Sequence, residues 1–141
     1  MRAQATEIAA SLGFNEAESM TLLDLGARCE QGLPISCFKR LRAMLAPECR
    51  HVLDALIPPA SLSQRKHGKL NACESDSVVR MADCRLVALR VFQDEAKAGR
   101  WLEKPHAFLG GRPPLQVAAT STCGAEAVDQ LLGRLQYGSA D

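Results

Sequence analysis

The side chains that could bind a charged partner gather in two short runs of this 141-residue sequence. The first run, residues 61–69, reads SLSQRKHGK, and its hydroxyl, amide, guanidinium and ammonium groups are those that contact phosphates and base edges in DNA. The second run, residues 109–115, reads LGGRPPL, and its single arginine can pair bidentately with a carboxylate or another anion. Both runs therefore indicate binding rather than catalysis.

The sequence shows no grouping of residues suited to catalysis or metal binding. It has no phosphate-cradling glycine motif, no Ser-His-Asp set and no paired acids in a plausible pocket. The six cysteines form no CxxC pair, and no histidine lies at zinc-ligand spacing. We therefore predict no enzyme activity, no catalytic residues, no metal and no cofactor, and we interpret the cysteines as buried small hydrophobic residues.

The composition predicts an all-α protein. Hydrophobic residues make up 47% of the chain and charged residues 23%, which is typical of a globular protein. Aromatic residues make up only 4%, β-branched residues are sparse, and Ala and Leu are abundant, so helix propensity exceeds strand propensity. No apolar run is long enough to cross a bilayer and no signal sequence is evident, so we expect a cytoplasmic protein.

The charges are distributed unevenly, although the net charge is only +1. Residues 1–33 carry two Arg against five Asp or Glu, which makes this segment acidic. Residues 36–70 carry seven Lys or Arg against two Asp or Glu, a balance of +5. The sequence therefore contains one basic block, within which the first run lies.

Hydrophobic periodicity and capping residues divide the chain into helices. A capping box of Asn15 and Glu18 predicts the start of the second helix, and one of Asn71 and Glu74 predicts the start of a long helix. The third short helix of the basic block, residues 59–67, has Leu62 as its only large apolar residue and is therefore expected to present a polar surface. The expected helices cover residues 3–12, 15–31, 34–45, 47–57, 59–67, 73–92 and 94–104, with a further turn from Pro113 or Pro114. A C-terminal amphipathic helix is expected to contain Val128, Leu131, Leu132 and Leu135 and to end at Gly138.

The stretch ECRHVLDALIPPASLSQRKHGKL has the order helix, tight turn and short polar second helix of a DNA-reading helix-turn-helix. Its position in the basic block supports this hypothesis, because cations there can contact phosphates. The alternative is that SQRKHGK is a solvated turn. The predicted DNA-binding residues are Arg40, Arg42, Ser61, Ser63, Gln64, Arg65, Lys66 and Lys69.

Four ordered motifs give the sequence a resemblance to a known family: ESD at 74–76, VFQDEAKAGRWLEKP at 91–105, LGGRPPL at 109–115 and LLGRLQYG at 131–138. Over about residues 35–138 the chain resembles the Xre/MbcA/ParS-type antitoxins. The resemblance implies an Xre-like helix-turn-helix region at 34–70 and a helical toxin-binding domain at 71–141, linked by the long helix 73–92. Residues 1–33 lie outside the strongest match and are expected to form an acidic helical N-terminal arm.

The resemblance also implies partners and site residues. The expected partner is a RES-domain toxin that consumes NAD or transfers ADP-ribose from it, with operator DNA as a second partner and a homodimer within a toxin–antitoxin hetero-oligomer. Trp101 and Phe108 are expected to pack the C-terminal domain. The residues expected to bind the toxin are Gly110, Gly111, Arg112, Leu135, Tyr137, Gly138 and Ser139.

Two alternatives stay open at this point. The acidic arm, residues 1–33, could be a docked helical hairpin or a mobile arm, and it could be the element that blocks the toxin, in place of the C-terminus, or one that excludes the operator. The whole chain could instead be a stand-alone helix-turn-helix transcription regulator whose C-terminal half serves only dimerisation.

Overall fold

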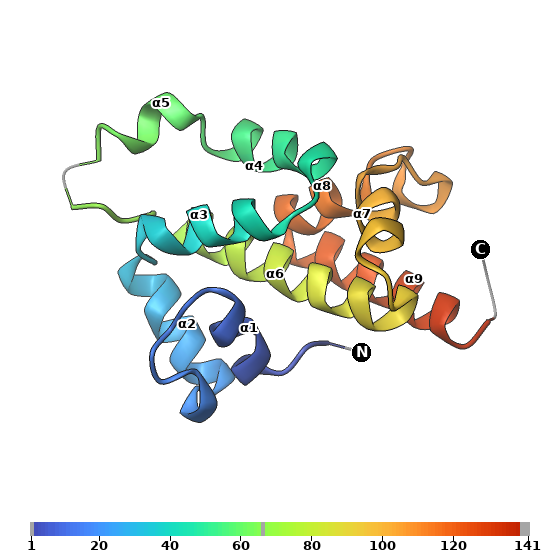
Figure 1. Ribbon diagram of the computed structural model, residues 1–141, viewed down its shortest axis with the longest axis horizontal. Coiled ribbons are helices and arrows are strands. Elements are labelled where there is room, and N and C mark those ends of the chain that lie inside the picture. Colours follow the sequence, from blue (N-terminus) through green and yellow to red (C-terminus); the bar gives the residue numbers. More distant parts are fainter. Residues whose placement is uncertain (1, 66, 139–141) are drawn as a thin grey trace.

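The computed structural model describes residues 2–65 and 67–138, which form an all-α fold, as the composition predicts (Figure 1). Within these ranges no β-strand is present, and two isolated bridges join Pro34 to Lys69 and His106 to Arg112. The α-helices are α1 (Ala5–Ser11), α2 (Leu22–Gln31), α3 (Ile35–Met44), α4 (Arg50–Leu56), α5 (Pro59–Leu62), α6 (Ala72–Phe92), α7 (Glu95–Glu103), α8 (Pro114–Thr120) and α9 (Thr122–Gln136). Three 3-10 helices complete the order: η1 (Ala17–Ser19), η2 (Pro47–Cys49) and η3 (Ala107–Leu109).

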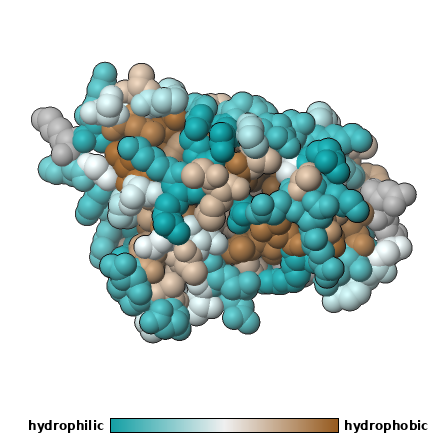
Figure 2. All heavy atoms as spheres, viewed as in Figure 1, coloured by the Kyte–Doolittle hydropathy of each residue, from teal (hydrophilic) through white to brown (hydrophobic). Residues whose placement is uncertain are grey.

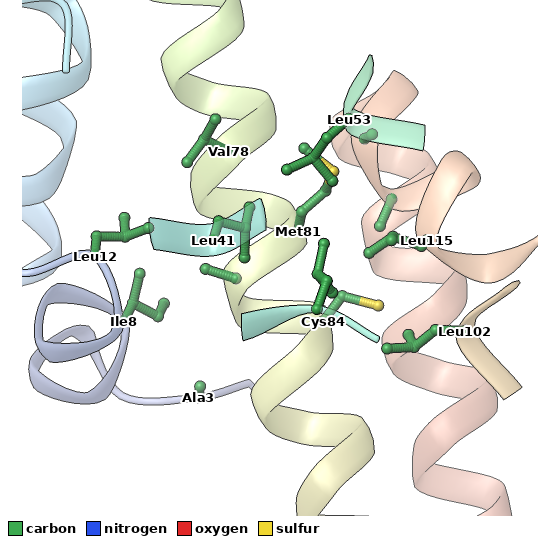
Figure 3. Close-up of a cluster of buried hydrophobic side chains, with 14 of the residues drawn as sticks. Ala3, Ile8, Leu12, Leu41, Leu53, Val78, Met81, Cys84, Leu102 and Leu115 are labelled. Atoms are coloured by element: carbon green, nitrogen blue, oxygen red, sulfur yellow. The ribbon is translucent and has the colours of Figure 1, made fainter. Parts of the chain in front are cut away.

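Helix α6 is the centre of the fold. The capping box of Asn71 and Glu74 starts it as predicted, and it packs against α1, α2, α3, α7, α8 and α9. Figure 3 shows its buried side chains Val78 and Met81 with α1 residues on one side and with Leu102 and Leu115 on the other. The helices before and after α6 therefore share one core rather than two.

The N-terminal arm is a docked part of this core. Ile8, Ala9 and Leu12 of the first helix are almost completely buried. The backbone N–H of Ala3 donates to the Asp83 carboxylate of α6 at 2.7 Å. Burial raises the pKa of the Asp83 carboxyl, so the bond from Ala3 compensates for an unfavourable environment. Residues 2–33 are thus docked on the core, which is the hairpin alternative and not the mobile one.

The predicted start of the second helix at Asn15 is wrong. Residues 17–19 form the 3-10 turn η1, and α2 begins after Thr21, whose hydroxyl accepts from the Asp24 N–H while the Asp24 carboxylate accepts from the Thr21 N–H. Asn15 and Thr21 both begin a capping-box pattern, but only a helix that starts after Thr21 has the observed length and buries its own Leu25 and Cys29. Helix α2 ends at Gly32, as predicted.

The predicted helix at residues 59–67 is also wrong in length, because α5 ends at Leu62. The chain continues in three-residue turns, in which the Gln64 N–H donates to Ser61 and the Arg65 N–H donates to Leu62. A polar segment with one apolar anchor buries too little surface to extend a helix. The helix-turn-helix hypothesis therefore has a second helix of a single turn.

The surface of the molecule is mainly hydrophilic on the face shown in Figure 2, with apolar areas between α3 and α5 and along α6. None of the helices within the described residues is both long and apolar enough to span a membrane.

Candidate functional site

The two predicted binding runs lie at opposite ends of the long axis of the molecule (Figure 1). Helix α5 and the residues after it lie at one end, and the loop between α7 and α8 lies at the other, near the end of α9. One chain can therefore contact two partners without the two surfaces overlapping.

The loop between α7 and α8 is held by hydrogen bonds that converge on His106. The backbone N–H of His106 donates to the Arg112 carbonyl at 3.2 Å, and its carbonyl accepts from the N–H groups of Leu109 and Gly111, each at 3.0 Å. The His106 Nδ1 accepts from the Phe108 N–H at 3.1 Å and so caps η3. The LGGRPPL segment thus begins as an ordered turn rather than a loose one.

The two glycines of this turn have left-handed backbone angles, with φ of +67° at Gly110 and +74° at Gly111. A side chain at either position would be strained by the backbone angle alone, although open space surrounds both. Their role is therefore to allow the turn, and Leu109, which is buried, anchors it to the core.

A row of ring contacts joins the long helix to this turn. Ring centroids are separated by 5.8 Å between Phe92 and Trp101, 6.3 Å between Trp101 and His106, and 5.5 Å between His106 and Phe108. Trp101 is half-buried, in keeping with packing. The expectation that Phe108 packs the domain is wrong, because 64% of this residue is exposed.

The other predicted toxin-binding residues lie on the turn and on α9. The Arg112 guanidinium donates to the Thr120 hydroxyl at 3.0 Å and is exposed. Tyr137 is 81% exposed beyond the end of α9, whereas Leu135 packs partly against the core. The Arg134 guanidinium lies 5.8 Å from the Phe108 ring centroid and so connects α9 to the turn. Gly138 is exposed, and Ser139 lies outside the described residues.

At the opposite end, Arg65 makes a bidentate ion pair with Glu74. The two Nη–Oε distances are 2.6 and 2.7 Å, and the two side chains are only 23% and 15% exposed. The Arg65 guanidinium lowers the pKa of the Glu74 carboxyl, while the same carboxylate accepts from the Asn71 N–H. Arg65, one of the predicted DNA-binding residues, therefore stabilises the start of α6 in this structure and would have to leave Glu74 to reach a base.

Three more of the predicted DNA-binding residues, Arg42, Ser61 and Ser63, make hydrogen bonds within the fold. Arg42 pairs with Asp54 at 2.9 and 3.0 Å, which lowers the pKa of the Asp54 carboxyl. The hydroxyls of Ser61 and Ser63 donate to the carbonyls of Pro58 and Ala60. The remaining predicted positions are Gln64, Arg40 and Lys69, which are exposed, and Lys66, which lies outside the described residues.

Exposed Arg40 and Lys69 remain available for phosphate contact. Across the described ranges, no ion pair involves either side chain. The carbonyl of Lys69 accepts from Arg65, so the backbone of this residue is held while its ammonium group faces solvent. Among the described members of the predicted DNA-binding set, these two are the exposed cations that form no ion pair with a described carboxylate.

Four of the six cysteines are buried and are therefore unsuited to act as nucleophiles. Cys29, Cys37, Cys49 and Cys84 are buried, as predicted, but Cys73 and Cys123 are exposed, which the sequence interpretation missed. Burial raises the pKa of the Cys29 and Cys49 thiols to about 12. A thiol at such a pKa stays protonated at neutral pH and is a poor nucleophile. Among the residues that the structure describes, no group of His, Cys, Asp and Glu could hold a metal ion.

Sequence reasoning missed the polar residues that join α6 to α8. The Ser77 hydroxyl donates to the Ala119 carbonyl at 2.8 Å, and Arg80 donates to the carbonyls of Ala118 and Ala119. These bonds satisfy the end of α8, where helix carbonyls lack intrahelical partners. No local pattern around Ser77 or Arg80 signals a contact about 40 residues away in the chain.

Comparison with known proteins places the turn and α9 in a family segment. Residues 88–138, from the last turns of α6 to the end of α9, match the family described as the antitoxin Xre/MbcA/ParS C-terminal toxin-binding domain. This part of the chain is therefore similar to that domain, as the ordered motifs predicted.

A curated relative extends the similarity toward the N-terminus. The protein named Antitoxin Xre from Pseudomonas putida is 33% identical to this chain over 99 residues, which is 69% of this chain and 60% of that protein. The chain thus spans about three fifths of the length of this relative.

Proposed function

We propose that this chain is an antitoxin that binds a partner toxin through residues 88–138 and thereby neutralises it. The observation that carries the proposal is the match of this segment to a toxin-binding domain. The ordered turn at Gly110 and Gly111, with exposed Arg112 and Phe108 beside it, supports the proposal, because Arg and aromatic side chains are the usual anchors of protein interfaces.

The proposed partner is a RES-domain toxin that hydrolyses NAD or transfers ADP-ribose from it, as the resemblance implies. Neutralisation is steric in this proposal: the C-terminal helices cover the toxin's NAD cleft, and the NAD chemistry belongs to the toxin. Stable inhibition requires an interface of about 1,200–2,000 Å². The anchors that we proposed from the sequence are Arg112, Leu135 and Tyr137, of which Arg112 and Tyr137 are exposed and Leu135 is partly buried.

Expression of the neighbouring open reading frame with this chain tests the antitoxin proposal. We expect the neighbouring product to arrest growth alone, and this chain to restore growth and co-purify with it. Arg112→Ala is expected to weaken the complex about 10-fold, the effect of losing one charge-assisted contact. Growth arrest that persists with the wild-type chain, without co-purification, would contradict the proposal and favour a stand-alone regulator.

We also propose that the chain binds its own operator, as a homodimer within the toxin–antitoxin complex. The balance of +5 in residues 36–70 and the exposed side chains of Arg40 and Lys69 support this role. With Arg42 and Arg65 engaged by carboxylates, phosphate contact contributes more in this proposal than base reading does.

Gel retardation of the promoter fragment by the purified chain checks the DNA proposal. We expect retardation to weaken steeply with salt, and an Arg40→Ala, Lys69→Ala double variant to reduce the salt slope by about 4, because the two copies of the homodimer together lose four phosphate contacts. Arg112→Ala is the control and should bind DNA normally. The double variant should in turn bind toxin normally. Full DNA binding by the double variant would exclude these two residues as phosphate contacts.

A further inference from the structure

We propose that Phe108 is the principal apolar anchor for the toxin, and that His106 and Arg134 act as positioning residues that hold its ring in place. This inference rests on the proposed function and names a residue that sequence reasoning assigned to the core. The matching surface on the toxin would be an apolar pocket with an acidic rim.

Exposure selects Phe108 from the large apolar side chains of the matched segment. Across the described part of residues 88–138, two large hydrophobic residues are strongly exposed, Phe108 at 64% and Tyr137 at 81%. Leu102, Leu115 and Leu132 are buried in the core and cannot reach a partner. The other large apolar residues of this segment are buried or packed partly against the core, so we expect the strongly exposed aromatic residues to be the anchors.

The structure orders Phe108 before a partner arrives. Its backbone N–H is bound by the His106 Nδ1 at 3.1 Å, and its ring lies 5.5 Å from the imidazole. The imidazole in turn contacts Trp101, which contacts Phe92 at the end of α6. Tyr137 caps the end of α9, with its backbone N–H donating to the Gly133 carbonyl at 3.2 Å, but its side chain is more exposed than that of Phe108. An ordered anchor loses less conformational entropy on binding, so we expect Phe108 to contribute more than Tyr137.

The charges around Phe108 indicate the chemistry of the partner. Arg134 lies 5.8 Å from the ring centroid, and exposed Arg112 follows the same turn. Residues 97–112 carry Lys97, Arg100, Lys104 and Arg112 against the single acid Glu103. Arg134 against the ring and Arg112 on the same turn complement an apolar pocket with carboxylates at its edge.

Affinity measurements with the co-purified neighbouring gene product test the anchor. Phe108→Ala is expected to raise Kd about 30-fold or more, the effect of truncating a hot-spot residue. Tyr137→Ala is expected to raise it less. The matched control is Leu23→Ala, which removes an 84% exposed side chain from α2, outside the matched segment, and should leave Kd unchanged. Thermal unfolding followed by circular dichroism should show all three variants folded, because each residue is exposed.

The positioning role of His106 has its own test. His106→Ala removes the acceptor for the Phe108 N–H and is expected to raise Kd about 3- to 10-fold, the cost of ordering one side chain on binding. His106→Asn keeps an acceptor oxygen of the kind favoured at helix caps and should restore most of the affinity. Equal losses in the two variants would overturn the positioning role.

The remaining outcomes separate this inference from the proposed function. If the wild-type chain binds toxin and Phe108→Ala binds as tightly, the anchor is overturned and the antitoxin proposal stands. A wild-type chain that binds no toxin overturns both. If Phe108→Ala instead dissociates a dimer of the chain alone in sedimentation, the surface joins two copies and the toxin is not its occupant.

Discussion

Gly32→Ala is expected to lower the free energy of unfolding by about 3 kcal/mol or more, which is a large part of the stability of a small domain. Gly32 ends α2 with φ of +92°, a conformation that costs other residues energy. A Cβ atom at this position would collide with the Leu70 carbonyl oxygen. The backbone there cannot retreat freely, because the Leu70 N–H donates to the Leu33 carbonyl at 2.8 Å.

Gly26→Ala is the matched control in the same helix. Gly26 lies in the middle of α2, and a Cβ atom there would meet nothing within 4 Å. We expect this substitution to raise the free energy of unfolding by about 0.5–1 kcal/mol, because alanine loses less conformational entropy in a helix. Urea unfolding followed at 222 nm compares the two variants. Equal stabilities would show that the segment around Leu70 yields to a side chain.

Removal of residues 105–141 is expected to abolish both cooperative unfolding and toxin binding. The deletion removes α8 and α9, and with them Leu115, Leu131 and Leu132, each at most 1% exposed. A single buried leucine truncated to alanine costs about 2–5 kcal/mol, so the loss of three is comparable to the whole 5–15 kcal/mol that stabilises a typical domain. Near-ultraviolet circular dichroism and a melting curve measure the result.

The control for this deletion is a chain that ends at Gly138. It keeps every described core residue, since the last apolar residue packed against the core is Leu135. We expect a cooperative melting curve close to that of the full chain. A cooperative transition in the longer deletion would instead mean that residues 2–104 fold alone. If the prediction holds, loss of neutralisation by the long deletion reports on folding, and the toxin interface must be mapped with point variants such as Arg112→Ala.

Local signals predicted most of the helix boundaries correctly. The capping box of Asn71 and Glu74 starts α6, Gly32 ends α2, and Asp94 caps α7. These features depend on side chains within a few residues of the backbone groups that they satisfy, so a short window of sequence contains the whole interaction. The capping-box pattern predicted the wrong start for α2, because Asn15 and Thr21 both begin such a pattern. Which of the two starts the helix depends on which side chains are buried, and a capping pattern does not contain that information.

The candidate site was predictable only in part. The ordered motifs located the matched segment and its turn, since a family pattern is a property of the sequence itself. The motifs did not indicate that Phe108 is exposed or that Trp101 and His106 support it. Likewise, the basic block located the cations near α5, but the carboxylates that engage Arg42 and Arg65 come from other elements.

The sequence alone thus determined the helical class, most helix ends and the two runs of basic and polar residues that could bind partners. The tertiary structure alone decided which of those residues face a partner. It placed Asp83 against the N–H of Ala3, 80 residues away, and it paired Arg65 with Glu74. The physical reason is range: a cap acts within one helical turn, whereas exposure and ion pairing depend on which distant helices pack together around α6.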